Sequence, residues 1–143
     1  MKDDPIPGSD HIARYCSFGS LTENGRVSGT AFRLKPTDDG YLSVDWLDIL
    51  EPSCREEQLR KVRLALSSRL KLGAKAKLAV LKVDGVIGYV RARSVDHREL
   101  IIKHRPLEND PSHSGIFNLR LEDDLIADLI AEAVSEDYPA RVP

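Results

Sequence analysis

The sequence predicts an α+β domain with a mainly antiparallel sheet built from hairpins and with two amphipathic helices. Three observations lead to this class. Runs rich in β-forming residues occur in pairs around short turn segments, two other segments repeat apolar residues at helical spacing, and strands and helices do not alternate regularly. The 143 residues fit one globular domain, in which we expect residues 1–9 and 138–143 to be flexible.

The first expected hairpin joins residues 29–35 to residues 41–48, because apolar side chains alternate with polar ones along both runs. The connecting residues 36–40 are rich in Pro, Asp and Gly, which favour turns. In this register Arg33 and Asp45 lie on the same outward face, where they would form a cross-strand ion pair.

Residues 52–73 predict an amphipathic helix. Ser53 is a candidate N-cap, and Gly73 is a candidate end of the helix. Between them Leu and Val recur at spacings of three and four residues. The outward arc of this helix is basic and contains Arg60, Lys61 and Lys71.

A second hairpin is expected from residues 76–83 and 86–93, two β-rich runs separated only by Asp84 and Gly85. This dipeptide is favoured in two-residue hairpin turns. If the two runs pair directly, one face of the hairpin is apolar and the other is basic. The basic face presents Lys82, Tyr89, Arg91 and Arg93.

Two further strands are expected at residues 100–104 and 116–121, on either side of a loop rich in Asn, Asp, Pro and Ser. Residues 122–135 then predict the second amphipathic helix. Its outward stripe is acidic and contains Asp124, Asp128 and Glu132.

Charge is distributed very unevenly along the chain. Residues 53–105 contain 14 Lys or Arg and 5 Asp or Glu, whereas residues 106–143 contain 2 basic and 9 acidic residues. A protein with a formal net charge of −2 can therefore still present a concentrated positive field.

The leading hypothesis from this charge pattern is that the protein binds a polyanion, either RNA or DNA or the phosphates of a nucleotide. Tyr89 offers a surface on which a base could stack, and the neighbouring cations would contact phosphates. The predicted basic surface consists of Lys82, Tyr89, Arg91, Arg93, Arg60, Lys61 and Lys71.

An alternative hypothesis is that the charges pair with one another. The acidic helix at residues 122–135 would lie against the basic helix at residues 52–73 and neutralise it. The protein would then be a protein–protein interaction module, for example a homodimer in which acidic and basic surfaces pair between chains.

Four short segments, preceded by Arg14, form a recognisable pattern. They are Gly25-Arg26-Val27-Ser28, Ala31-Phe32, Leu42-Ser43-Val44-Asp45 and Asp110-Pro111-Ser112-His113. This pattern resembles a family of small uncharacterised bacterial proteins. The resemblance implies a bacterial origin and no particular activity. It directs attention to the polar residues Arg14, Arg26, Ser28, Ser43, Asp45 and His113.

These polar residues suggest a third hypothesis, an enzyme that acts on a nucleotide or a phosphorylated substrate. His113 would transfer a proton, and Asp45 would orient it, or a neighbouring arginine would hold an anionic substrate. The candidate phosphate-binding residues are Arg14, Arg26 and Arg33. A purely structural role is the competing interpretation, with Ser112 and His113 stabilising a turn.

Several classes of function are not expected. His97, His104 and His113 lack the short spacings of zinc ligands, so we expect no metal. The chain has no GxGxxG, GxxxxGK[ST], HExxH or GxSxG motif, and we expect no cofactor. No apolar run approaches the ~20 residues of a membrane helix, and the first residues lack a secretion signal, so we expect a cytoplasmic protein.

Overall fold

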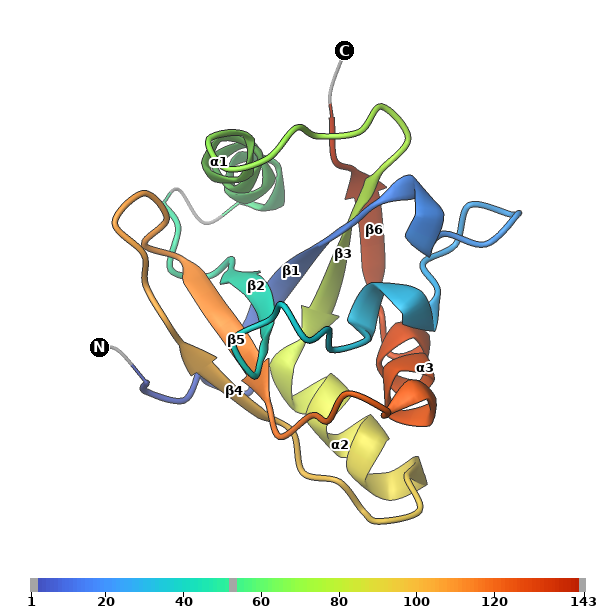
Figure 1. Ribbon diagram of the computed structural model, residues 1–143. Coiled ribbons are helices and arrows are strands. Elements are labelled where there is room, and N and C mark those ends of the chain that lie inside the picture. Colours follow the sequence, from blue (N-terminus) through green and yellow to red (C-terminus); the bar gives the residue numbers. More distant parts are fainter. Residues whose placement is uncertain (1–2, 52–53, 142–143) are drawn as a thin grey trace.

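The computed structural model describes residues 3–51 and 54–141, and these form one antiparallel sheet with helices on both faces (Figure 1). The strands are β1 (His11–Cys16), β2 (Leu42–Trp46), β3 (Lys77–Lys82), β4 (Ile101–His104), β5 (His113–Phe117) and β6 (Glu136–Pro139). The α-helices are α1 (Arg55–Ser67), α2 (Val83–Arg93) and α3 (Asp124–Glu132), and the 3-10 helices are η1 (Phe18–Ser20) and η2 (Gly29–Phe32). The predicted α+β class with a mainly antiparallel sheet is confirmed.

The sheet has the strand order β4-β5-β2-β1-β3-β6, and every neighbouring pair is antiparallel. β1 pairs with β3 along its whole length, from His11 to Cys16. Its pairing with β2 is much shorter and comprises the register pairs Ile12–Trp46 and Ala13–Asp45. The two central strands therefore separate after Ala13.

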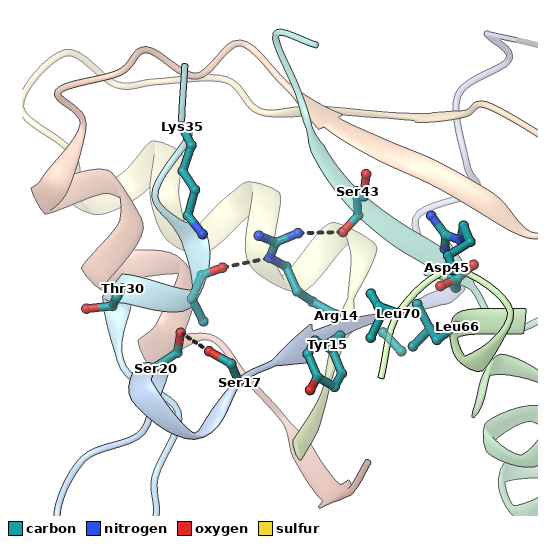
Figure 2. Close-up of a pocket in the computed structure, with 13 residues that line it drawn as sticks. Arg14, Tyr15, Ser17, Ser20, Thr30, Lys35, Ser43, Asp45, Leu66 and Leu70 are labelled. Carbon is teal, nitrogen blue, oxygen red and sulfur yellow. Dashed lines mark hydrogen bonds between the residues drawn. The ribbon is translucent and has the colours of Figure 1, made fainter. Parts of the chain in front are cut away.

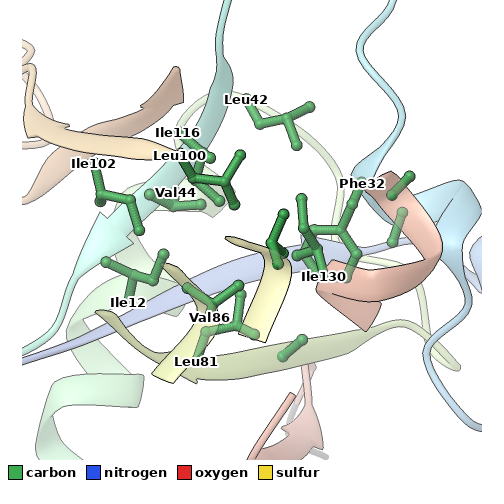
Figure 3. Packing of buried hydrophobic residues seen from close by; sticks show 14 of the residues in the cluster. Ile12, Phe32, Leu42, Val44, Leu81, Val86, Leu100, Ile102, Ile116 and Ile130 are labelled. Atoms are coloured by element: carbon green, nitrogen blue, oxygen red, sulfur yellow. The ribbon is translucent and has the colours of Figure 1, made fainter. Parts of the chain in front are cut away.

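One face of the sheet is covered by α2, α3 and η2 (Figures 1 and 3). Ile12 and Leu81 of the sheet pack there against Val86 of α2, Phe32 of η2 and Ile130 of α3, and all five side chains are buried. Full burial of each such side chain contributes about 1.5–3 kcal/mol. This cluster fixes η2 beside the sheet and so positions the segment that leads into β2.

The opposite face is covered in part by α1, whose Leu59, Val62 and Leu66 pack on Leu78 and Val80 of β3. α1 therefore lies on the other side of the sheet from α2 and α3. On this face β2 and β5 present polar side chains instead, and the candidate site forms there.

The predicted hairpin across Asp84 and Gly85 is wrong, because β3 ends at Lys82 and α2 begins at Val83. Val83, Val86 and Val90 are spaced by three and four residues, so they also form a helical stripe, and all three are buried in α2. Asp84 stands in the first turn, where a carboxylate interacts favourably with the helix dipole. An Asp-Gly hairpin turn would require a positive φ angle at Gly85, but the φ angle of Gly85 in the structure is not positive.

The predicted hairpin of residues 29–35 and 41–48 is also wrong in its first strand. Residues 29–32 form η2, and β2 pairs with β1 and β5 instead. Gly29 packs so closely on α3 that a Cβ atom there would lie 2.0 Å from Oδ1 of Asp128. The tight packing of Gly29 on α3 therefore determines the conformation of η2. The alternation of apolar and polar residues in the sequence does not reveal such packing.

The described residues contain three α-helices, so the prediction of two amphipathic helices is not confirmed. α1 and α3 fall within the predicted helical ranges, but the predicted N-cap Ser53 lies outside the described residues. β4 agrees with the strand predicted at residues 100–104, whereas β5 begins three residues before the predicted 116–121 and ends at Phe117.

Parts of the two terminal segments are hydrogen-bonded to the sheet, and their flexibility stays a prediction. Ile6 N donates to the Ile102 carbonyl at 3.0 Å, and Ala140 N donates to the Ala76 carbonyl at 2.9 Å. Tyr138 and Pro139 belong to β6. Within the described residues, no helix has the length and apolar character needed to cross a membrane.

Candidate functional site

The separation of β1 from β2 creates the candidate site. Where the backbone pairing stops, the half-buried Arg14 side chain lies between the strands. Its Nε donates to the Ala31 carbonyl at 2.6 Å, and its Nη1 donates to the Ser43 carbonyl at 2.7 Å. The guanidinium thus connects β1, η2 and β2 by hydrogen bonds that the backbones do not make themselves.

A cleft of about 310 Å³ opens at this point (Figure 2). It is bounded by β1, β2, the segment from η1 to Lys35 and the residues at the end of α1. Its polar lining includes Arg14, Lys35, Ser43, Asp45 and Arg69. This volume lies at the lower end of the range for small-molecule sites.

The side chains of Ser43 and His113 are hydrogen-bonded at the candidate site. Ser43 is exposed in β2, and its Oγ lies 3.1 Å from Nε2 of the buried His113 in β5. Nδ1 of His113 lies 2.7 Å from the backbone carbonyl of Arg105. A hydroxyl, an imidazole and a group that orients the imidazole therefore stand in one hydrogen-bonded series.

This geometry determines which nitrogen of a neutral His113 carries the proton. A carbonyl oxygen only accepts hydrogen bonds, so Nδ1 donates its proton to Arg105. Nε2 is then unprotonated and accepts the hydroxyl proton of Ser43. This arrangement is the one that a nucleophile and its general base require.

The environment of His113 favours the neutral imidazole. Burial lowers the pKa of His113, and the positive charges of Arg69 and Arg105 act in the same direction. The backbone hydrogen bond to Arg105 and the charge of Asp110 oppose this effect without reversing it. His113 is therefore available as a base near neutral pH.

Asp45 lies opposite His113 in the β2–β5 register, yet its hydrogen bond is to another residue. Oγ of Ser112 lies 3.0 Å from Oδ1 of Asp45 and 2.8 Å from Oδ1 of Asp110. Arg69 donates to Oδ2 of Asp110 at 3.1 Å. Two buried carboxyl groups thus meet around one hydroxyl.

This cluster favours the protonated form of Asp45. Burial raises the pKa of Asp45 well above its usual range, and the hydrogen bond and negative charge of Asp110 raise it further. Ser112 has one hydroxyl proton and can donate it to only one carboxylate, so the second carboxyl group must supply a proton of its own. The neutral acid is therefore the favoured form of Asp45 in the cleft.

An aromatic wall stands beside the hydroxyl and imidazole pair. The rings of Tyr41 and Phe117 stack with centroids 4.8 Å apart, and Tyr41 meets His113 edge to face at 6.1 Å. They fit over Gly115, where a Cβ atom would lie 2.3 Å from the Tyr41 ring. Arg105 lies over the Tyr41 ring at 5.4 Å. This wall limits solvent access to one side of His113.

Of the residues predicted for an enzyme site, Arg14 and Asp45 line the cleft, and His113 lies beside it, opposite Asp45 in the β2–β5 register. The structure places Arg26 and Arg33 elsewhere. Arg26 is exposed and lines a separate surface depression with Asp137, and Arg33 lies 3.4 Å from Asp124. The expected ion pair of Arg33 with Asp45 is absent because Arg33 is not in a strand beside β2.

The predicted basic surface does not form as one face. Tyr89, Arg91 and Arg93 lie on α2, and Arg60 and Lys61 lie on α1 across the sheet. Tyr89 Oη donates to Glu132 at 2.5 Å, Arg91 pairs with Glu99 at 3.1 Å and Lys82 approaches Asp84 at 3.7 Å. Polyanion binding stays an untested prediction, without the hairpin face on which it was based.

The predicted contact between the acidic and basic helices is wrong. α3 packs on α2 and η2, and α1 lies on the opposite face of the sheet. Arg60 pairs instead with Glu57 of its own helix at 2.8 Å, and Lys71 follows α1 as an exposed residue. Pairing with another protein or with a second copy stays a prediction.

Sequence reasoning missed the partners that complete the site. Arg69, Asp110 and Ser112 converge on Asp45, and Lys35 lines the cleft. Ser43 was singled out but was given no role. The signal available was that Ser43, Asp45, Asp110, Ser112 and His113 fall in two of the segments of the sequence pattern, residues 42–45 and 110–113, which are joined by hydrogen bonds in the structure.

Within residues 3–51 and 54–141, no group of three or more His, Cys, Asp or Glu residues is placed to hold a metal ion. Comparison with protein families, with curated proteins and with solved structures finds no match to this chain. The resemblance to small bacterial proteins therefore stays a prediction, and the function must be argued from the site itself.

Proposed function

We propose that the protein is a hydrolase in which Ser43 is the nucleophile and His113 is the general base. The observation that carries this proposal is the Ser43 Oγ to His113 Nε2 hydrogen bond of 3.1 Å, with Nδ1 held by the Arg105 carbonyl at 2.7 Å. Nucleophile, base and orienting group stand in the order that activates a serine hydroxyl.

The reaction proceeds by acyl transfer from an ester. Oγ of Ser43 attacks the ester carbon while His113 Nε2 takes the hydroxyl proton, and the alcohol leaves with that proton. Water then attacks the acyl-enzyme, giving one proton to His113, and Ser43 regains it as the acid departs. The result is one ester and one water converted to one acid and one alcohol.

The surroundings of the pair support this chemistry. Ser43 is exposed, so a substrate can reach its hydroxyl, whereas His113 is 2% exposed and shielded beside the Tyr41 ring. A base must be deprotonated before it can accept a proton, and the lowered pKa of His113 favours that state. The backbone carbonyl of Arg105 fixes the imidazole of His113, so a change of the Arg105 side chain need not disturb the tautomer of His113.

The test is covalent labelling with a fluorophosphonate, followed by intact mass and peptide mapping. The Ser43 oxygen forms a bond to phosphorus, fluoride leaves and His113 takes the proton. We expect one label, on Ser43, in the intact protein. Ser43→Ala should abolish it, His113→Gln should slow it by about 10²-fold or more, and Ser67→Ala, at an exposed serine on α1, should change nothing. Labelling that is absent, or equally fast without His113, would overturn the proposal.

A further inference from the structure

Among the described residues, Arg14 forms no ion pair with a carboxylate, unlike most arginines of this chain. Ion pairs join other arginines to acidic residues; these are Arg33, Arg55, Arg60, Arg69, Arg91, Arg98 and Arg105. Arg14 is half-buried and contacts only backbone carbonyls by its hydrogen bonds. Burial lowers the pKa of Arg14, and the negative charge of Asp38 opposes this effect without reversing it, so a further anion at this position would be stabilising.

Two of the three guanidinium nitrogens of Arg14 are held in place by hydrogen bonds. Nε and Nη1 donate to the Ala31 and Ser43 carbonyls at 2.6 Å and 2.7 Å. Within the described residues, Nη2 makes no hydrogen bond. Because the fork is already immobilised, a ligand that binds Nη2 incurs little further loss of side-chain freedom.

Lys35 brings a second cation to the same cleft. In Figure 2 its side chain extends toward the Arg14 guanidinium, and both residues line the cleft. Its Nζ forms no ion pair with the described carboxylates. The nearby Asp38 accepts a hydrogen bond from the backbone N–H of Lys35 at 2.7 Å and pairs with neither side chain. Two like charges thus face one space, which favours an anion between them.

Residues with hydroxyl groups also line the cleft, and those of Ser17 and Ser20 lie 3.3 Å from each other. Tyr15 Oη accepts a hydrogen bond from Gly73 N at 3.0 Å, so its own proton is available to a ligand. Ser17, Ser20 and Thr30 also line the cleft. Asp45 adds no opposing charge while it holds its proton, because burial raises the pKa of this carboxyl.

We propose that this cleft binds the phosphate group of a small molecule between Arg14 and Lys35. The inference rests on the proposed function for one point, that the reactive end of the same molecule reaches Ser43. Arg14 hydrogen-bonds the carbonyl of Ser43 itself, so the phosphate site and the nucleophile are adjacent in β2. The substrate class is therefore a small ester that carries a phosphate.

The donor set favours phosphate over carboxylate. A phosphate presents at least three acceptor oxygens and a charge of about −1.5 to −2 near neutral pH. A carboxylate presents two oxygens and one charge. The two cations, one of which is the planar guanidinium of Arg14, exceed the single charge of one carboxylate.

The test is calorimetric titration of the intact protein with inorganic phosphate and, at matched ionic strength, with acetate. We expect saturable phosphate binding and at least tenfold weaker acetate binding. Lys35→Ala should weaken phosphate binding by about tenfold, the effect of one lost charge-assisted hydrogen bond. Lys82→Ala is the matched control, because Lys82 is exposed at the end of β3 and does not line the cleft.

Arg14→Lys provides the second variant, since it keeps the charge and loses the planar fork. Lys35 is exposed, so Lys35→Ala remains informative even if changes at Arg14 impair folding. No phosphate binding at millimolar concentration, equal binding of acetate, or unchanged binding by Lys35→Ala would each overturn the proposal.

The same variants separate this proposal from the hydrolase proposal. Ser43→Ala should bind phosphate as the unaltered protein does, because only its backbone carbonyl contacts Arg14. Lys82→Ala, outside the cleft, should bind phosphate and be labelled by a fluorophosphonate as the unaltered protein is. Failure of labelling with intact phosphate binding rejects the nucleophile, whereas the reverse result rejects the phosphate site.

Discussion

Asp45 and His113 are register partners in β2 and β5, yet the side chain that hydrogen-bonds His113 belongs to Ser43, two residues earlier in β2. Residues two apart in a strand lie on the same face, so both side chains can reach His113. Asp45 is engaged by Ser112 instead, at 3.0 Å. The imidazole of His113 is thus oriented by the backbone carbonyl of Arg105 and hydrogen-bonded to the hydroxyl of Ser43. The carboxyl group of Asp45 is not part of this hydrogen-bonded series.

The first prediction concerns the pH dependence of Ser43 labelling. His113 must be neutral to act as a base, and its pKa is lowered chiefly by burial. The labelling rate should therefore rise with pH and reach its plateau through a midpoint below ~6.5, the usual value for histidine. Measurement of the fluorophosphonate rate between acidic and neutral pH gives this midpoint, and a midpoint above ~6.5 would contradict the assigned environment.

The second prediction concerns stability and pH at Asp45. The pKa of Asp45 is raised in the folded protein by burial and by Asp110, so its stabilising contribution is complete below the unfolded value of ~3.8. That contribution is lost as pH rises through the folded-state pKa. Asp45→Asn is neutral at all pH values and should not show this loss.

Urea unfolding of both proteins from acidic to mildly alkaline pH measures the effect. The free energy of unfolding of Asp45→Asn should increase relative to the unaltered protein by ~1 kcal/mol or more as pH rises. The exposed variant Glu122→Gln is the control. Curves for Asp45→Asn that stay parallel to the unaltered protein would show that Asp45 is charged in the fold.

The third prediction distinguishes helix from hairpin at Asp84 and Gly85. In α2 a Cβ atom at Gly85 meets only Cβ of Lys82 at 3.6 Å, and one at Gly88 has nothing within 4 Å. Gly85→Ala and Gly88→Ala should each stabilise the protein by about 0.5–1 kcal/mol, since alanine favours helix over glycine. Gly25→Ala, at φ +77°, should destabilise it. Thermal unfolding of these variants measures the change in stability. Destabilisation by Gly85→Ala would favour the hairpin over the helix.

The fourth prediction tests the aromatic wall. A Cβ atom at position 115 would lie 2.3 Å from Cδ2 of Tyr41 and 2.9 Å from Cε1 of Phe117. Gly115→Ala should therefore cost about 1–3 kcal/mol of stability, and truncation of Tyr41 in the same protein should remove much of the clash. Gly19→Ala, with nothing within 4 Å, is the control in the urea titration. An equal loss of stability in Gly115→Ala and Gly19→Ala would mean that the rings of Tyr41 and Phe117 do not pack over Gly115.

The fifth prediction compares two ion pairs. The Arg98 side chain is 5% exposed and donates to Asp123 at 2.5 Å and 3.1 Å, which ties the loop after α2 to the start of α3. Arg98→Ala should cost about 3–5 kcal/mol, because Asp123 is left without its partner. Arg91→Ala, whose pair with Glu99 is largely exposed, should cost at most about 1 kcal/mol. Similar losses in chemical denaturation would contradict the difference in burial.

The sequence predicts the fold class because strand and helix propensities are local, but it misassigns α2 because two periodicities coincide there. Val83, Val86 and Val90 satisfy a helix directly and satisfy a hairpin if Asp84 and Gly85 form the turn. Burial against Ile130 and Leu81 selects the helix. That choice depends on tertiary contacts, which a local pattern does not contain.

The site was only partly predictable for a related reason. His113 and Asp45 attracted attention as residue types, whereas the role of Ser43 depends on the β2–β5 register. Arg14 gains its position only because β1 and β2 separate after two register pairs. Neither the pairing of distant strands nor the point where pairing stops is encoded in a short segment.

The outer strands of the sheet have a consequence for how this protein meets other molecules. Residues Asp3 to Ile6 run along β4, with His104 N donating to the Asp4 carbonyl at 2.9 Å and Ile6 N donating to the Ile102 carbonyl at 3.0 Å. At the other edge β6 has four residues, begins with two acidic side chains and ends at Pro139, which has no N–H. Strand addition from another chain is therefore blocked along β4 and disfavoured along β6. Fibrillar growth through either edge is discouraged for the same reason.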